Sequence, residues 1–168
     1  LFGVPYPLDP AQQGLSCLSE DGRVQFLLLN SSWQIDERHR ERASISDGAL
    51  ARMLEAAEAQ RAGSPAGGRR PLRIAVWHHP VQSDGEDRIK NTGFLDRLAQ
   101  AGFRVGMHGH MHFAQIGQHA YDVTANGRKL RLLGAGTFGA PTQDWRNGVP
   151  LQYQILCIQK AQVKVLSR

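Results

Sequence analysis

Histidines gather in two short segments of the sequence, each placed directly after an apolar stretch. Five of the seven histidines lie there: residues 74–80 read Ile-Ala-Val-Trp-His-His-Pro, and residues 108–112 read His-Gly-His-Met-His. Imidazole is the commonest metal-ligating side chain, and histidines at strand ends can direct their nitrogens into a shared pocket. We expect Gly109 to give the backbone room to turn there. The spacing predicts a metal site built from both segments.

Carboxylates are missing from this histidine framework. A hydrolytic metal site usually includes an acidic ligand, and neither segment contains one. The nearest acidic cluster is Asp84-Gly85-Glu86-Asp87, which follows the first segment. The two segments therefore predict part of a metal centre, whose remaining ligands come from elsewhere.

Length and composition predict one globular domain spanning residues 1–168. The chain is 41% hydrophobic and 21% charged, which is enough apolar sequence for one sizeable core. Its formal charge of +5 would attract phosphate-bearing molecules in a general way. No apolar run is long enough to cross a bilayer, residues 1–7 do not resemble a signal peptide, and Cys17 and Cys157 are best interpreted as free thiols. We expect a soluble, cytoplasmic protein without a membrane partner.

The first two thirds of the sequence alternate between strand and helix patterns. A hairpin is expected over 15–29, with a turn at 20–22, and the continuous apolar run 26–29 predicts a strand covered on both faces. Ser46 is a plausible N-cap for a helix reaching residue 61. A strand over 72–77, a helix around residues 94–98 and a strand over 103–107 follow. This order predicts an α/β fold, in which ligands gather at the carboxyl ends of the strands.

Short strands and turns dominate the last third. Strands are expected over 114–117, 129–133, 151–159 and 162–166, with a hairpin turn at Asn126-Gly127, and they predict an antiparallel finish. The glycine-rich stretch 134–139 does not open a helix, so it fails the context test for a phosphate-binding loop. The charged run 38–42 mixes with acidic residues and predicts a solvated surface that includes His39.

The two histidine segments resemble the last two signature blocks of the calcineurin-like metallophosphoesterase family. Residues 24–30, the helix that follows them and residues 133–158 are also similar to the second half of that family. The resemblance implies a four-layer α/β/β/α sandwich. It also implies a centre of two divalent or trivalent ions, of manganese, iron or zinc type, that hydrolyses phosphoesters with a metal-bridging water.

The resemblance assigns a role to each histidine of the two segments. His78 and His110 match ligands of the second metal, and His112 matches a ligand of the first. His79 and His108 are expected to support these ligands or to line the substrate pocket together with Gly109, because strand alternation would turn His79 away from His78. His119 is expected at the surface.

The sequence also departs from the family pattern. The D-x-H, G-D-x-x-D and G-N-H blocks, which precede the histidine blocks in the family, do not occur here. We therefore interpret the chain as the carboxyl-terminal portion of such a domain, with the upstream half of the same fold as its partner. On this interpretation the chain alone shows almost no turnover, and apolar strand faces such as 26–29 lose their covering layer.

Three classes of function remain open at this stage. The first is a phosphodiesterase or phosphatase acting on a nucleotide or another small phosphoester. The second is a non-catalytic module whose histidines bind a metal or whose surface binds a partner. Nucleic-acid binding is the least favoured, because the basic residues are interspersed with acidic ones and no aromatic platform accompanies them.

Overall fold

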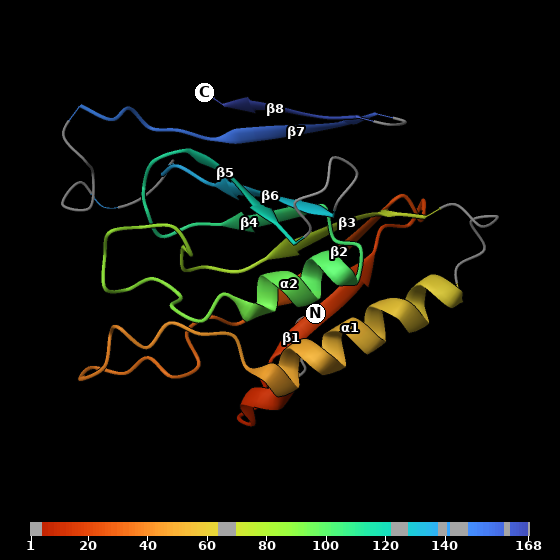
Figure 1. The fold of residues 1–168 in the computed structure, drawn as a ribbon, viewed down its shortest axis with the longest axis horizontal. Coiled ribbons are helices and arrows are strands. Elements are labelled where there is room, and N and C mark those ends of the chain that lie inside the picture. Colours follow the sequence, from red (N-terminus) through yellow and green to blue (C-terminus); the bar gives the residue numbers. More distant parts are fainter. Residues whose placement is uncertain are drawn as a thin grey trace.

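The computed structural model describes residues 5–63, 70–121, 128–137, 141, 148–159 and 162–167. These residues form three layers, in which two helices cover one face of a six-stranded sheet and a two-stranded hairpin lies over the other face (Figure 1). In chain order the elements are the 3-10 helix η1 (Pro10–Gln12), β1 (Gly14–Leu18), β2 (Val24–Leu29), α1 (Asp47–Ala62), β3 (Leu72–Val76), α2 (Gly93–Gln100), β4 (Val105–His108), β5 (Gln115–Ala120), β6 (Lys129–Gly134), β7 (Gln154–Gln159) and β8 (Gln162–Ser167).

The large sheet has four parallel strands at its centre. Its order is β1-β2-β3-β4-β6-β5, where β2, β3, β4 and β6 run parallel and the edge strands β1 and β5 run antiparallel to their neighbours. The predicted α/β class is confirmed. The antiparallel pairing predicted for the last third of the chain is found between β5 and β6 and between β7 and β8. The prediction was wrong for the other side of β6, which pairs in parallel with β4.

The predicted hairpin forms from β1 and β2, which pair antiparallel around a turn over 19–22. The expectation that residues 26–29 are covered on both faces was wrong for one of them. Leu27 and Leu29 are buried beneath the helical layer, and Phe26 packs against the opposite core, but Leu28 is 38% exposed. The reason is that the β7–β8 hairpin covers only part of that second face.

Both predicted helices form, and local sequence explains their bounds and orientation. The Ser46 hydroxyl accepts a hydrogen bond from the backbone N–H of Ala49, which caps α1. Leu50 of α1 and Leu95 and Leu98 of α2 are buried against the sheet. Apolar residues at helical spacing therefore fix the faces that the two helices turn toward the strands.

Two apolar cores separate the layers. The larger one lies between the helices and the sheet, and the smaller one lies between the sheet and the β7–β8 hairpin. The smaller core contains the buried residues Ile74, Val105 and Leu133, with Leu156, Ile158 and Val165 of the hairpin packed on them. The three layers hold the carboxyl ends of β3 and β4 side by side at one edge of the sheet.

The remaining predictions concern two loops, the two cysteines and membrane-spanning helices. The turn at Asn126-Gly127 and the end of the glycine-rich stretch 134–139 lie outside the described residues. Cys17 and Cys157 are free thiols and partly buried, as expected. Within the described part of the chain, no helix combines the length and the apolar character needed to span a bilayer.

Candidate metal centre

The two histidine segments lie next to each other because β3 and β4 are neighbouring parallel strands. Backbone hydrogen bonds continue between the two chains past the strand ends, from the Trp77 N–H to the Met107 carbonyl at 3.0 Å and from the Gly109 N–H to the His78 carbonyl at 3.0 Å. These bonds fix the spacing of the loops that carry the side chains. The position agrees with the rule that sites in α/β folds form at the carboxyl edge of the sheet.

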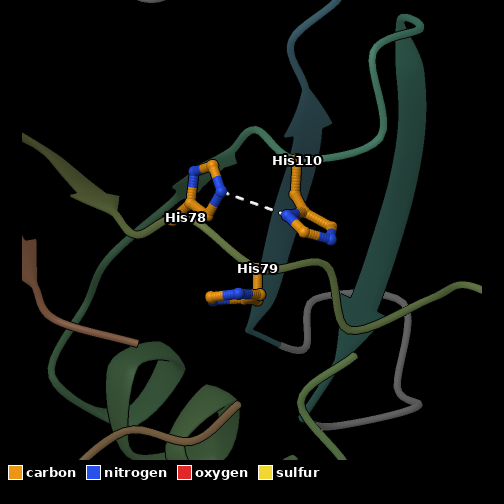
Figure 2. A group of neighbouring side chains, drawn as sticks. All are labelled: His78, His79 and His110. Carbon is orange, nitrogen blue, oxygen red and sulfur yellow. Dashed lines mark hydrogen bonds between the residues drawn. The ribbon is translucent and has the colours of Figure 1, made fainter. Parts of the chain in front are cut away.

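Three imidazole rings converge at this edge, those of His78, His79 and His110. Each ring offers one nitrogen, and these nitrogens lie within 4.8 Å of one another. Figure 2 shows His78 and His110 facing each other, with 3.1 Å between His78 Nε2 and His110 Nδ1. An ion bonded tetrahedrally to nitrogen at about 2.0–2.1 Å holds its ligand atoms roughly 3.3 Å apart. The His78–His110 pair therefore fits one small ion, and the wider separation in the group would have to close when the ion binds.

His79 joins His78 on the same side, contrary to the expectation from strand alternation. The reason is that β3 ends at Val76, so residues 78 and 79 lie in a turn where the alternation of a strand no longer applies. The ring of His79 lies with its centroid 4.7 Å from that of His110. Its residue is only 5% exposed. His79 is therefore a candidate ligand.

Ser31, which follows β2, holds this turn in place. Its Oγ is within hydrogen-bond reach of three groups: it accepts from the backbone N–H of His78 at 3.2 Å and of His79 at 3.1 Å, and it lies 2.9 Å from His79 Nδ1. With both acceptor positions of the hydroxyl taken, its proton points to Nδ1, and the ring proton then sits on Nε2. Ligation through Nε2 would require the other tautomer, in which Nδ1 carries the proton and could donate to Ser31 only in place of one backbone N–H. Sequence reasoning did not find Ser31.

A carboxylate also reaches the cluster. Asp87 Oδ2 makes a short hydrogen bond with His110 Nε2. A carboxylate on the outer nitrogen of a histidine fixes its tautomer, which here leaves His110 Nδ1 directed at His78. The same hydrogen bond is the main cause that holds the pKa of the Asp87 carboxyl below its usual value. Sequence reasoning noted the 84–87 cluster but did not connect it to the histidines, because a distance of 23 residues carries no signal of contact.

The electrostatics of the cluster favour neutral imidazoles. Burial, followed by the neighbouring rings of His110 and His78, lowers the pKa of His79 to about 4. Burial and the nearby His110, His112 and His108 rings also lower the pKa of His78. A neutral imidazole has a lone pair available for a metal ion, so near neutral pH both rings are in the charge state that ligation needs.

His112, predicted as a ligand, does not belong to the group of three. It lines an open hollow of about 690 Å³ beside the cluster, together with His110, Asp87 and the polar side chains of Gln82, Ser83 and Gln115. The structure thus brings His78 and His110 together and places His112 in the adjoining wall. This hollow adjoins the imidazole group through His110.

His108 and Gly109 occupy supporting positions. His108 is 5% exposed, its ring stacks at 6.2 Å on that of Trp77, and its Nδ1 is 3.2 Å from the Gly109 carbonyl. The backbone turns with a positive φ at His110 (70°) and His112 (57°), and Gly109 has no positive φ. The expectation that Gly109 provides the turn was therefore wrong. Two non-glycine residues adopt the left-handed conformation instead, which is uncommon and concentrates at functional sites.

The two remaining histidines lie outside the cluster. His39 pairs with Asp36 in a loop, at 3.0 Å between Nδ1 and Oδ1, in keeping with the solvated surface predicted there. His119 of β5 is more enclosed than expected, because its side chain is 25% exposed and its Nε2 lies 2.7 Å from Asp96 Oδ1 of α2. His119 therefore links the edge of the sheet to the helical layer.

Comparison with known sequences adds no relative. The sequence matches no protein-family model and no curated protein sequence. The structure by itself defines a mixed α/β fold with a histidine cluster that could hold a metal ion.

Proposed function

We propose that this chain supplies the histidine ligands of a metal-dependent phosphoester hydrolase, a phosphodiesterase or phosphatase with a two-metal centre. The observation that carries the proposal is the convergence of imidazoles from the ends of β3 and β4. The resemblance of these segments to the calcineurin-like metallophosphoesterase blocks supports the reaction class. The partial α/β/β/α sandwich that the resemblance implies is compatible with the three layers seen in Figure 1.

The described donors suit one ion better than two. His78, His79 and His110 are the single group of three or more metal-binding side chains found among the described residues. The donors are nitrogen, which suits zinc and other borderline ions of the manganese or iron type. His112 lies beside the group, where it could serve a second ion only with further carboxylates. On this proposal those come from outside the chain, as from an upstream half of the same fold, and the chain alone is nearly inactive.

Each residue would have a defined role in the reaction. Bound metal ions supply Lewis acidity and a water of lowered pKa. His78 and His110 hold their nitrogens at a fixed spacing, and Asp87 keeps the His110 ring oriented through its Nε2. The hollow lined by Gln82, Ser83, Gln115 and His112 offers hydrogen-bonding groups to a phosphoester. Ser31 fixes the loop that carries His78 and His79.

Metal titration of variants tests the ligand set. Zinc and manganese binding to the wild-type chain is compared with that of His78→Ala, His79→Ala, His110→Ala and His112→Ala, with His39→Ala as a matched control that removes a distant imidazole. We expect His78→Ala and His110→Ala to lower the metal affinity at least tenfold and His39→Ala to leave it unchanged. Equal binding by the wild type and His110→Ala would refute the site.

Hydrolysis of a simple phosphodiester, bis(p-nitrophenyl) phosphate, tests the reaction class. The assay uses the metal-loaded chain alone and the chain assembled with the proposed upstream half of the fold. The expected result is a metal-dependent rate that falls with His110→Ala. An assembled enzyme that binds metal at these histidines but does not cleave phosphoesters would contradict the proposal.

The second candidate is a non-catalytic metal-binding or partner-binding module. The observation in its favour is that the described histidine group contains no carboxylate of its own, while Asp87 touches a ring nitrogen of His110. A tight metal site that stabilises the fold without any hydrolysis would favour this candidate.

A further inference from the structure

A second cavity lies at the opposite end of the sheet from the histidines. It has a volume of about 1160 Å³ and is lined by the residues that precede or begin the parallel strands, including Arg23 before β2, Arg73 in β3 and Arg104 before β4. Ile158 and Gln159 of β7 and Val163 of β8 line it on one side. Its volume is sufficient for a small organic ligand.

Positive charge is concentrated in this cavity. Six arginines line it, against two carboxylates, those of Asp21 and Glu58. The six arginines exceed the two carboxylates by four charges, which is close to the formal charge of +5 for the whole chain. Like charges held together destabilise a fold unless a counter-charge compensates them.

Four of these arginines have partners within the fold. Arg23 pairs with Asp21 at 3.7 Å, and Arg61 pairs with Glu58 at 2.9 Å. Arg73 is buried, contacts Glu58 and donates to the Ala101 carbonyl, and Arg128 donates to the Gln100 carbonyl. The last two bonds satisfy carbonyls at the carboxyl end of α2, which is a structural role.

Arg70 and Arg104 are different. Both line the cavity and are exposed, and neither has a carboxylate within salt-bridge distance among the described residues. In addition, Nη2 of the buried Arg73 has no hydrogen-bond partner in the described part of the chain. The cavity therefore keeps the guanidinium donors of Arg70 and Arg104 available after its internal contacts are made.

We propose that this cavity binds a small oligophosphate, an anion with at least two linked phosphate groups, through Arg70 and Arg104. One guanidinium group binds two oxygens of one phosphate, so two guanidinium groups match an anion with two phosphates. The apolar part of the lining, Pro71, Leu72, Ile158 and Val163, leaves room for an organic group attached to the phosphates. A cavity of this volume matches a small anion better than an extended nucleic acid.

Tripolyphosphate binding to the metal-free 168-residue chain is the direct test, measured by calorimetry at constant ionic strength. The double variant Arg70→Gln, Arg104→Gln removes both available cations. The control, Arg52→Gln paired with Arg40→Gln, makes the same charge change at exposed arginines outside the cavity. Removing one charged hydrogen-bond partner costs about tenfold in affinity, so the double variant should bind roughly 100-fold more weakly while the control binds normally.

Three outcomes would overturn the inference: no binding by the wild type, equal weakening in both double variants, or tighter binding of a single-stranded oligonucleotide than of tripolyphosphate. The equal weakening would indicate general attraction by net charge. His110→Ala should bind tripolyphosphate as the wild type does, so the test is independent of the proposed metal centre.

Discussion

Replacement of Ser31 by alanine is the most informative single change near the histidines. The residue is 1% exposed, and its Oγ accepts two backbone hydrogen bonds, from the N–H groups of His78 and His79. In Ser31→Ala both donors lose their partner. A buried donor left without a partner costs about 1–3 kcal/mol. Because the hydrogen bond from the His78 N–H is only partly buried, we expect a total loss of about 2–3 kcal/mol in the free energy of unfolding.

Urea unfolding followed by circular dichroism measures this loss as a lower midpoint with an unchanged slope. Ser44→Ala is the matched control, because the Ser44 hydroxyl donates to Gln34 at 2.9 Å in an exposed contact. The control should lose less than about 0.5 kcal/mol. The loosened turn should also weaken zinc binding about tenfold or more, since groups that orient a ligand contribute that much. Equal stability of the two variants would refute the assigned role of Ser31.

Three further predictions concern the same region. The pKa of His79 is about 4 in the folded protein, below its ordinary value of 6.5. As pH falls, the unfolded chain therefore takes up this proton before the folded chain does. The metal-free protein should lose up to about 3 kcal/mol of stability as pH falls from 7 to 4. Unfolding midpoints across that range check it, and His79→Gln should flatten the profile. Gly106→Ala should destabilise the fold by about 1–3 kcal/mol in thermal unfolding, because a Cβ there would lie 2.5 Å from the Trp77 ring; a stability equal to wild type would contradict this packing. Asp87→Asn should weaken zinc binding about 10- to 100-fold by releasing the His110 ring, and an unchanged affinity would show that the carboxylate does not orient it.

Local patterns in the sequence were sufficient for most elements of the fold. Ser46 marked the start of α1, and apolar residues at helical spacing marked the buried faces of both helices. The apolar runs before the histidines predicted β3 and β4, whose parallel pairing brings His78 and His110 together. These features depend on interactions between residues close in sequence, or on one general rule about strand ends.

Contacts between distant segments could not be predicted in the same way. The insertion of β6 beside β4 depends on strand order, which no local pattern records. Ser31 and Asp87 reach the histidines from other loops, 48 and 23 residues away. His79 was placed by a rule for strands, although the strand had already ended at Val76. The positive φ values at His110 and His112 similarly arise from the loop as a whole.

The backbone hydrogen bonds between the loops after β3 and β4 set the distance between the two loops that would hold an ion. Neighbouring strands lie about 4.8 Å apart, and the ring centroids of His78 and His110 are separated by 5.0 Å. The two loops therefore present nitrogen donors close to each other at this edge of the sheet. A calcium ion, which prefers six to eight oxygen ligands, would be disfavoured by these nitrogen donors. The loops at this edge of the sheet would thus favour ions that accept nitrogen ligands, before any further ligand joins the centre.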